Sequence, residues 1–271
     1  MQPISASRQI LDAIQQAKAG ATAFCTNFYP VESRLQNWIA HAELFEEHHP
    51  GAVFFFRNDR DFRHFYFCAA DVAALGQGMA ASPALRAGGI VADIVGNESS
   101  LAPLAAAFEQ AGFRRYTRLV RLARIGRPET NGEESAVVWA EAADRPAALE
   151  LIESAFDRYG EQIPTPYEME AAIASRQMLV VKSEGRLAGL LFFETQGITS
   201  TVRFWAVAED FRGRHIGSSL MRQYFRIHAP VRRFTLWVNS ANENALTKYR
   251  HYGYAPDSLV DQVFANEMIR Q

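Results

Sequence analysis

A glycine-bearing turn between an expected strand and an expected helix is the stretch of this chain best suited to bind an anion. An aromatic-rich apolar run over 201–207 predicts the strand, and apolar residues at helical spacing over 216–225 predict the helix. Such a turn presents backbone N–H groups and the N-terminus of a helix. Gly213 and Gly217 have no Cβ, so a phosphate can lie against the main chain, and Arg212 adds a fixed positive charge. By itself the pattern is a weak indication, because similar turns also merely connect elements.

A second block further along the chain strengthens this interpretation. Residues 236–254 predict a strand, an asparagine-rich turn, a short helix, and a glycine that ends the helix before a last strand. Together the two blocks resemble the GNAT superfamily of N-acetyltransferases. In that superfamily an Arg/Gln-x-x-Gly-x-Gly/Ala turn holds the pyrophosphate of acetyl-CoA, and an Asn-x-x-Ala-x-x-x-Tyr helix ends in an aromatic-Gly-aromatic sequence. Asn242, Ala245, Tyr249 and Gly253 match the second motif fully.

The first motif matches with one departure. Arg212 and Gly217 fit it, but His215 stands where its first small residue is expected. His215 has three open interpretations. It can tolerate the backbone angles of a glycine and leave its N–H group to bind phosphate, or its side chain can donate a further hydrogen bond to the phosphates. It can instead indicate a weakened cofactor site. We favour the first. The resemblance implies that acetyl-CoA is bound by Trp205, Ala206, Val207, Arg212, Gly213, Arg214, His215, Ile216, Gly217, Ser218, Asn242 and Tyr249.

The chemistry that the resemblance implies is direct transfer of an acetyl group from the thioester to a primary amine. An amine with a pKa near ~10 is mostly protonated at neutral pH, so a base must take a proton before the attack. The resemblance assigns stabilisation of the oxyanion to strand N–H groups near Val207, and protonation of the departing thiolate to Tyr249.

The general base stays open at this stage. Many relatives carry a glutamate on the strand before the turn, where this chain has Thr201, which cannot serve. Glu194 on the neighbouring strand is our candidate for the general base, in addition to Tyr249 as a catalytic residue, and Glu161 is a comparable candidate. A chain of water molecules could take the proton instead. In that case Glu194 and Glu161 are ordinary solvated residues. The loop that contains Glu161 lies where the superfamily builds part of its acceptor pocket, so we expect Tyr159 and Glu161 to bind the substrate.

The elements around these motifs predict an α/β protein of the α+β type. In the first half we expect helices over 5–19, 31–47, 71–80 and 100–110, and strands over 52–57, 62–69, 89–95 and 113–125. In the second half we expect helices over 144–159 and from 165, a hairpin of 178–183 with 187–194, and a strand over 198–207.

The order of elements in the two halves is the same, which predicts two tandem GNAT-like domains, each a mixed, mostly antiparallel sheet flanked by helices. The domains run over 1–126 and 136–271, and a linker over 127–135 joins them. The first copy is degenerate: Phe108 matches Tyr249 but has no hydroxyl, and residues 71–78 lack the arginine and the glycine spacing of the phosphate turn. We expect it to support the second copy and to form a wall of the acceptor site.

Composition limits the other classes of function. The chain has 271 residues, 48% of them hydrophobic, and a formal charge of −2, so neither a nucleic-acid-binding face nor a basic membrane-binding face is indicated. No apolar run approaches the ~18 residues of a membrane span, and the N-terminus has no signal-peptide core. Cys25 and Cys68 predict reduced thiols in a cytoplasmic protein, with a disulfide between them left open. The histidines show no metal-ligand spacing.

Two alternatives to acetyl transfer remain from the sequence. The first is a CoA- or acyl-CoA-binding module without turnover, a sensor or partner protein, which His215 and Thr201 both favour. The second is an acyltransferase with a longer acyl donor or an acyl carrier protein. The expected partner of the enzyme is an amine on a small molecule or on a protein, and the expected assembly is a monomer or a homodimer.

Overall fold

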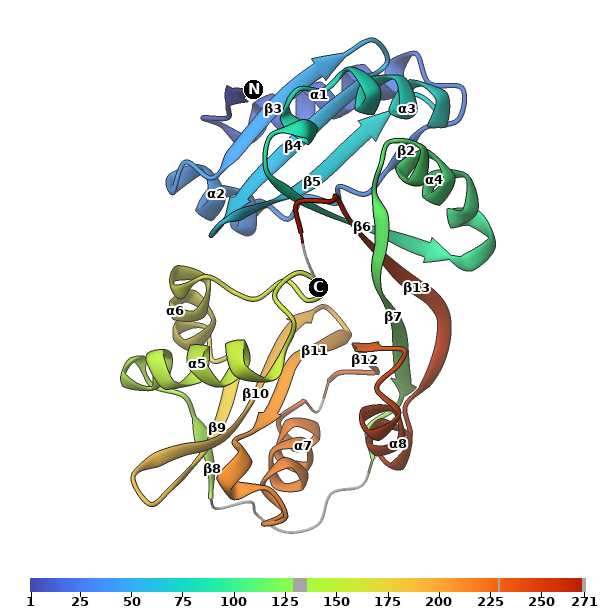
Figure 1. Ribbon diagram of the computed structural model, residues 1–271. Coiled ribbons are helices and arrows are strands. Elements are labelled where there is room, and N and C mark those ends of the chain that lie inside the picture. Colours follow the sequence, from blue (N-terminus) through green and yellow to red (C-terminus); the bar gives the residue numbers. More distant parts are fainter. Residues whose placement is uncertain (129–135, 229, 270–271) are drawn as a thin grey trace. The chain divides into compact units, whose positions relative to one another are not determined.

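The protein is described by a computed structural model covering residues 1–128, 136–228 and 230–269 (Figure 1). By their internal contacts the residues form two compact units: unit 1 is Met1–Leu119 with Ser258–Gln271, and unit 2 is Val120–Asp257. Most of the predicted linker over 127–135 lies outside the described residues. The units differ from the predicted domains at the strand ends, because residues 120–126 belong to unit 2 and residues 258–271 belong to unit 1.

Unit 1 is a mixed sheet with helices packed against it. Its strands follow the order β1 (Gln2–Pro3), β3 (Leu44–His49), β4 (Ala52–Asp59), β5 (Phe62–Ala69), β6 (Gly89–Asn97) and β13 (Ala255–Ala265), with β2 (Cys25–Thr26) paired to β5. The β5–β6 pair is parallel and the other pairs are antiparallel. The helices are α1 (Ser7–Ala19), α2 (Glu32–Ala40), α3 (Val72–Ala81) and α4 (Glu98–Gln110), with a 3-10 turn η1 (Ala84–Arg86). Its core is rich in fully buried phenylalanines from β4 and β5: Phe54, Phe55, Phe56, Phe65 and Phe67.

The helix predicted over 31–47 is wrong in its second half. The helix α2 ends at Ala40, Ala42 adopts a positive φ of 54°, and strand β3 begins at Leu44. Leu44 and Glu46 are buried on one face of β3, which pairs with β4 along its whole length. The left-handed residue breaks the helix, and strand pairing then decides the conformation of a segment whose apolar spacing fits a helix.

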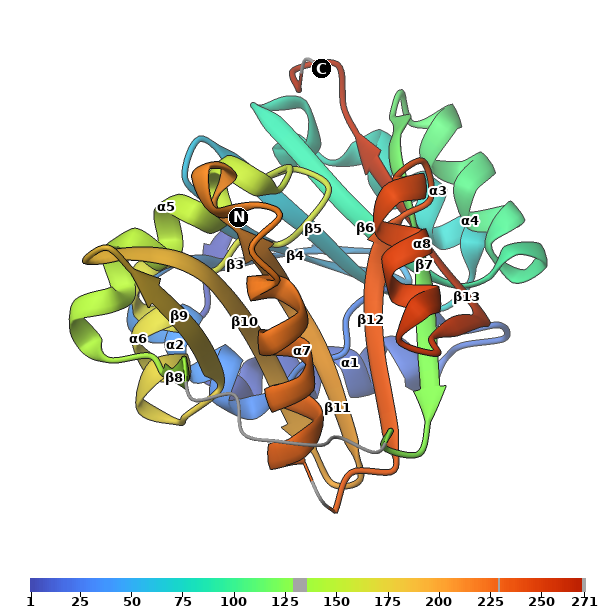
Figure 2. The ribbon, with the colours of Figure 1, turned by 90° about the horizontal axis from the view of Figure 1, so that it is seen from below.

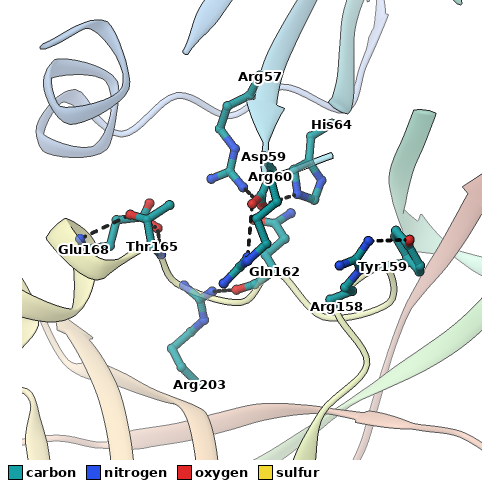
Figure 3. A network of polar contacts seen from close by, with 10 residues as sticks. All are labelled: Arg57, Asp59, Arg60, His64, Arg158, Tyr159, Gln162, Thr165, Glu168 and Arg203. Atoms are coloured by element: carbon teal, nitrogen blue, oxygen red, sulfur yellow. Dashed lines mark hydrogen bonds and ion pairs between the residues drawn. The ribbon is translucent and has the colours of Figure 1, made fainter. Parts of the chain in front are cut away.

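A buried ionic cluster closes the β4–β5 hairpin. The Asp59 carboxylate accepts hydrogen bonds from Arg57 at 2.5 Å and contacts His64 Nε2 at 3.1 Å (Figure 3). Burial raises the pKa of Asp59, but the hydrogen bond to His64 and the charges of Arg57, His64 and Arg60 outweigh it and lower the pKa to about 2. The carboxylate is therefore ionised at neutral pH and holds the hairpin together.

Unit 2 is a second mixed sheet with helices on both faces. Its strands follow the order β7 (Arg114–Ile125), β12 (Arg233–Asn239), β11 (Thr199–Val207), β10 (Arg186–Gln196), β9 (Met178–Ser183) and β8 (Val137–Trp139). The β11–β12 pair is parallel, and β8 to β11 pair antiparallel. The helices are α5 (Arg145–Ala155), α6 (Pro166–Ala174), α7 (Ile216–Ile227) and α8 (Glu243–His251), with 3-10 turns η2 (Ala142–Asp144) and η3 (Glu209–Phe211).

Each face of this sheet has its own hydrophobic core. The α7 core contains Leu220, Met221, Tyr224, Phe225, Leu246 and Tyr249, packed on strand residues such as Val202. The α5 core contains Ala148, Ile152, Met169, Ala172 and Ile173, packed on strand residues such as Phe204 and Ala206. The helices α7 and α8 therefore cover one face, and α5 and α6 cover the other.

The elements of the two halves match once β3 is included. Two helices, three strands, a helix, a strand, a helix and a strand run from α1 to β7 and again from α5 to β13. The last strands are exchanged: β7 ends in unit 2, while Leu259–Ala265 of β13 pairs antiparallel with β6 of unit 1. Asn266 anchors the end of β13 because its Oδ1 accepts a hydrogen bond from Ile90 N and its Nδ2 donates to Gly88 O.

The first copy has no counterpart of the predicted phosphate turn. Only Ala70 and Asp71 separate β5 from α3, and the Asp71 carboxylate caps α3 by accepting a hydrogen bond from Ala74 N. A carboxylate that already occupies a helix N-terminus repels a phosphate there. Phe108 is fully buried and packs against Phe113 and Phe264, so it is a core residue.

Three further findings concern the limits drawn from composition. No helix among the described residues is long and apolar enough to cross a membrane. Within the ranges that the structure covers, no group of three or more His, Cys, Asp or Glu side chains is arranged to hold a metal ion. Cys25 and Cys68 lie on the paired strands β2 and β5 as free thiols. Burial raises the pKa of Cys25 to about 11.

Candidate active site

The backbone of the phosphate turn explains the departure at His215. His215 is the N-cap of α7 and adopts the left-handed conformation, with φ 59° and ψ 9°. A glycine adopts this conformation at no steric cost, and histidine is among the residues that tolerate it. The structural part of our favoured interpretation is thus confirmed: His215 takes the backbone angles of a glycine.

The turn presents a continuous run of backbone N–H groups without partners. None of the N–H groups from Gly213 to Ser218 donates a hydrogen bond to another described residue, and the first such bond of α7 runs from Ser219 N to His215 O. Residues 212–215 are exposed, while Ile216 is buried in the α7 core. Unpaired donors at the N-terminus of a helix favour an anion electrostatically and by hydrogen bonding.

Gly217 is a glycine because an aromatic ring covers it. A Cβ at Gly217 would lie 3.1 Å from Cζ2 of Trp205 and 3.4 Å from Cγ2 of Val207. The Trp205 ring also packs against Tyr249, with 5.6 Å between ring centroids. Trp205 therefore packs against both the first turn of α7 and helix α8.

The two arginines of the turn differ in how firmly they are held. The Arg212 guanidinium is largely exposed and approaches Glu209 at 3.8 Å. Arg214 donates to Glu184 at 3.1 Å and lies over the ring of Phe211. Arg212 gives up only a weak contact with Glu209 when it turns toward a bound anion, whereas Arg214 is held by Glu184 of the β9–β10 hairpin.

Strand pairing ends beside this turn. The parallel register of β11 and β12 runs only from Thr199 with Arg233 to Val202 with Leu236, although both strands continue (Figure 2). On the other edge of β11, Ala208 N donates to Ala188 O, so by alternation the N–H groups of Trp205 and Val207 face the β12 side. These N–H groups lie beyond the last registered pair and are available to a ligand.

A β-bulge at Arg203 directs these side chains. Phe192 pairs with Phe204 and Phe193 pairs with Val202, so Arg203 is the extra residue of β11. Val202 lies in the α7 core but Phe204 lies in the α5 core, because the extra residue reverses the alternation. The reversal turns Trp205 and Val207 toward α7, and Ala206 toward the α5 core.

Tyr249 lies on α8 with its ring buried in the α7 core. Its hydroxyl makes no hydrogen bond to any other residue that the structure describes. Burial and then the negative charge of Glu161 raise the pKa of Tyr249, so the phenol is protonated and can act only as a proton donor at neutral pH. Asn242 Oδ1 caps α8 by accepting from Ala245 N at 3.0 Å, and Gly253 ends the motif with a φ of 76°.

The loop between α5 and α6 carries the predicted substrate-binding residues. Helix α5 is shorter than predicted and ends at Ala155, because Phe156 becomes extended and packs edge-on against Phe204. A capping box opens α6: Glu168 N donates to Thr165 Oγ1 and Thr165 N donates to Glu168 Oε2 (Figure 3). Between these ends the loop is held by its own polar contacts.

Asp157 organises the first half of this loop. Its Oδ1 accepts hydrogen bonds from the N–H groups of Tyr159 at 2.9 Å and Gly160 at 2.7 Å. Arg158 lies over the Tyr159 ring and donates to its hydroxyl (Figure 3). Burial of Glu161, followed by the charge of Asp157, raises the pKa of the Glu161 carboxyl to about 7, although a hydrogen bond with the Asp157 backbone opposes the shift.

The other acid of the prediction, Glu194, is engaged in an ion pair. Its Oε1 accepts from Arg203 Nη1 at 2.8 Å, and Arg203 Nη2 donates to Gln162 O at 3.3 Å (Figure 3). Thr201 bonds to Thr235 through their hydroxyls at 2.8 Å. The charge of Glu161 contributes to the raised pKa of Tyr249, while Glu194 is tied to the loop between α5 and α6 through Arg203. The sequence analysis did not single out Arg203, although a charged residue within an otherwise apolar strand could have indicated it.

The sequence model of the Acetyltransferase (GNAT) family matches residues 145–254, which contain the turn, Tyr249 and the acceptor loop. Residues 145–254 form a GNAT domain. The GNAT domain lies wholly within unit 2. Among proteins with curated descriptions, none matches this chain.

Solved structures extend the likeness over the whole chain. A tandem GNAT protein from the clavulanic acid biosynthesis pathway is similar with a TM-score of 0.61 and 14% identity, covering 100% of this chain and 98% of that one. A GCN5-related N-acetyltransferase from Sphaerobacter thermophilus has a TM-score of 0.59 and 18% identity, covering 81% of this chain and 78% of its own. A putative GNAT acetyltransferase from Novosphingobium aromaticivorans has a TM-score of 0.57 and 16% identity, with 94% and 97% covered. The fold is therefore tandem GNAT, as predicted.

Proposed function

We propose that this protein is an acetyl-CoA-dependent N-acetyltransferase that acetylates a primary amine by direct attack on the thioester. The observation that carries the proposal is the run of unpaired N–H groups from Gly213 to Ser218, next to strands that stop pairing and to the unbonded hydroxyl of Tyr249. The N–H donors of the turn and the positive end of the α7 dipole suit a pyrophosphate and a pantetheine chain. The absence of a Cβ at Gly217 lets the Trp205 ring pack against the turn.

Each part of the site has one task. The N–H groups of the turn bind the pyrophosphate, and the Arg212 guanidinium turns toward it. Acetyl-CoA, when bound, supplies an acetyl thioester to the amine. The N–H groups of Trp205 and Val207 face the opened edge of β11 and stabilise negative charge on the carbonyl oxygen. Tyr249 Oη holds the proton that the leaving sulfur takes.

The acceptor is a primary amine on a small molecule or on a protein, held by the loop with Tyr159 and Glu161. We also propose that the protein acts in the cytoplasm, as a monomer or a homodimer. The free thiols Cys25 and Cys68 support a reducing compartment.

Calorimetric titration with acetyl-CoA tests the cofactor part of the proposal. We expect the unsubstituted protein to bind, and a double variant with Arg212→Ala and Gly217→Glu to lose binding, because the new carboxylate repels phosphate and collides with Trp205. Arg8→Ala is the matched control, since Arg8 is an exposed arginine of unit 1 that pairs with Asp12. Absence of binding by the unsubstituted protein would contradict the proposal.

Thiol release with a panel of primary amines tests turnover. We expect Tyr249→Phe to lower kcat by about a hundredfold while the dissociation constant of acetyl-CoA changes little, because only the proton donor is removed. Binding without thiol release from any amine would instead support the non-catalytic CoA-binding module. Competition among acyl-CoA chain lengths distinguishes an acetyl donor from a longer one.

A further inference from the structure

The last strand of the first copy supplies an arginine to the second half of the chain. The strand β7 lies next to β12 in the order of the sheet, and its residues from Val120 onward belong to unit 2 (Figure 2). Leu122 of this strand is buried in the α7 core together with Tyr249 of α8. Arg124 follows two residues later, so the alternation of a strand places it on the same face of β7 as Leu122.

Three contacts hold the Arg124 guanidinium. Its Nε donates to Gly126 O at 3.1 Å, its Nη1 donates to Tyr252 O at 2.9 Å, and the group lies 5.9 Å from the centroid of the Phe225 ring. Within the part of the chain that the structure describes, it pairs with no carboxylate. Tyr252 is the C-cap of α8, so its carbonyl has no donor within the helix. Arg124 therefore caps the C-terminus of α8, where the helix dipole favours a positive charge.

The same side chain explains the glycine that follows this carbonyl. Gly253 has a φ of 76°, and a Cβ at this position would overlap Arg124 Nη1. A larger residue would therefore strain the backbone and also push the guanidinium away from Tyr252 O. The aromatic-Gly-aromatic sequence and Arg124 thus form one arrangement, although 128 residues separate Arg124 from Tyr252.

The capped turn closes on Tyr249. The main-chain carbonyl of Tyr249 accepts hydrogen bonds from Tyr252 N at 3.0 Å and from Tyr254 N at 3.1 Å. The rings of Tyr254 and Trp205 both pack against the Tyr249 ring, with centroids 6.0 Å and 5.6 Å away. The place of the Tyr249 hydroxyl therefore depends on where this turn is held, and Arg124 ties the turn to β7.

We propose that Arg124 is a positioning residue for Tyr249, supplied by the last strand of the first copy. This inference rests on the proposed function, in which the Tyr249 hydroxyl gives its proton to the leaving sulfur. Arg124 acts through the main chain of α8 and lies outside the residues 145–254 that match the GNAT family model. Because proton transfer depends steeply on the distance between donor and acceptor, a shifted end of α8 slows the reaction. The first copy, which has no phosphate turn, thus contributes to the site by its last strand.

Turnover of Arg124→Ala tests this role in the full chain, with acetyl-CoA and the best acceptor of the primary-amine panel. We expect kcat to fall about tenfold and the acetyl-CoA dissociation constant to stay within about twofold, because the phosphate turn is untouched. Arg124→Lys should recover part of the loss, since an ammonium can donate to Tyr252 O but lacks the fork that reaches both carbonyls.

Arg232→Ala is the matched control. Arg232 is an exposed arginine of the same unit, and it bonds to Gly126 and Ile198 through its main chain. We expect its kcat to stay within about twofold of the unsubstituted value, because the loss of a surface charge does not move α8.

Two double-variant cycles separate positioning from general damage. Without the Tyr249 hydroxyl there is no donor to place, so Arg124→Ala should change the kcat of Tyr249→Phe by less than about twofold. Gly253→Ala should lower kcat by itself, because its Cβ displaces the guanidinium. Adding Arg124→Ala to Gly253→Ala should then lower kcat by less than about a further twofold.

A kcat of Arg124→Ala within about twofold of the unsubstituted value, or losses that multiply in either cycle, would overturn the inference. If Arg124→Ala does not fold, Arg124→Lys and its cycle with Tyr249→Phe decide by the same criteria. A slow Tyr249→Phe beside an unaffected Arg124→Ala means that this inference alone fails. If Tyr249→Phe keeps the full rate, or the unsubstituted protein transfers no acetyl group to any amine, the proposed function fails and this inference fails with it.

Discussion

Trp205 covers Gly217 so closely that a Cβ on the glycine would lie 3.1 Å from Cζ2 of the indole. This contact ties the first turn of α7 to β11, the strand that carries the N–H groups of Trp205 and Val207. The packing of one residue pair therefore links two parts of the predicted site.

The first prediction follows from that contact. Gly217→Val should lower the free energy of unfolding by about 1–3 kcal/mol, because the added methyl groups must displace Trp205 or Val207. Acetyl-CoA affinity should fall by about tenfold or more, since the displaced turn no longer aligns its N–H groups. Urea denaturation and calorimetric titration measure the two effects. Unchanged affinity would mean that the turn does not bind the cofactor.

The second prediction separates the interpretations of His215. Because His215 adopts a φ of 59°, His215→Gly should change the free energy of unfolding by less than about 1 kcal/mol. His215→Val should cost about 2 kcal/mol, because a β-branched residue strongly disfavours this conformation. If His215 serves only through its backbone, His215→Gly keeps full acetyl-CoA affinity in calorimetry. A marked loss of affinity would instead show that the imidazole donates to a phosphate.

The third prediction concerns the support of the acceptor loop. Arg203→Ala removes both the hydrogen bond to Gln162 O and the partner of Glu194, each a contact with a charged group worth about 1.5–3 kcal/mol. We expect KM for the amine to rise by about ten- to a hundredfold, with the acetyl-CoA dissociation constant unchanged. Arg203→Lys should recover part of the loss. An equal loss of acetyl-CoA affinity would point to general damage rather than to a positioning role.

The fourth prediction gives the stability consequence of burying the Glu161 carboxyl. The folded-state pKa of Glu161 is about 7, above the ordinary value of 4.5. A raised carboxyl pKa contributes stability that is full below the unfolded pKa and is lost as pH rises through the folded one. Glu161→Gln should therefore be more stable than the unsubstituted protein by about 1–3 kcal/mol at pH near 8, with little difference at pH near 4. Denaturation at the two pH values checks this, and a gain of equal size at both would contradict it.

Local patterns predicted the elements that local interactions stabilise. The strands β4 and β5 and the helix α3 follow from the apolar spacing within each segment, and Asp71 and Thr165 cap their helices through contacts with residues close in sequence. The predictions failed where a distant partner decided the outcome. Residues 44–47 have apolar spacing that suits a helix, yet pairing with β4 makes them a strand, and Phe156 leaves its helix to pack on Phe204.

The same division holds for the site. The two motifs identified the turn and Tyr249, because their chemistry depends on residue types at short spacing. The difference between Glu161 and Glu194 did not follow from the motifs, since burial raises the pKa of Glu161 while Glu194 is paired with Arg203. Burial and ion pairing arise from contacts between residues far apart in the chain.

The sequence by itself determined the GNAT domain over 145–254, the order of its elements and the glycine-bearing turn before α7, because these depend on short-range spacing. The tertiary structure alone decided three features: the bulge at Arg203 that turns Trp205 toward α7, the pairing of β13 with β6, and the ion pair of Glu194 with Arg203. The sequence of a strand does not specify which strand it pairs with, and the pKa of a carboxyl depends on its neighbours in space. These features appear only when the chain is packed.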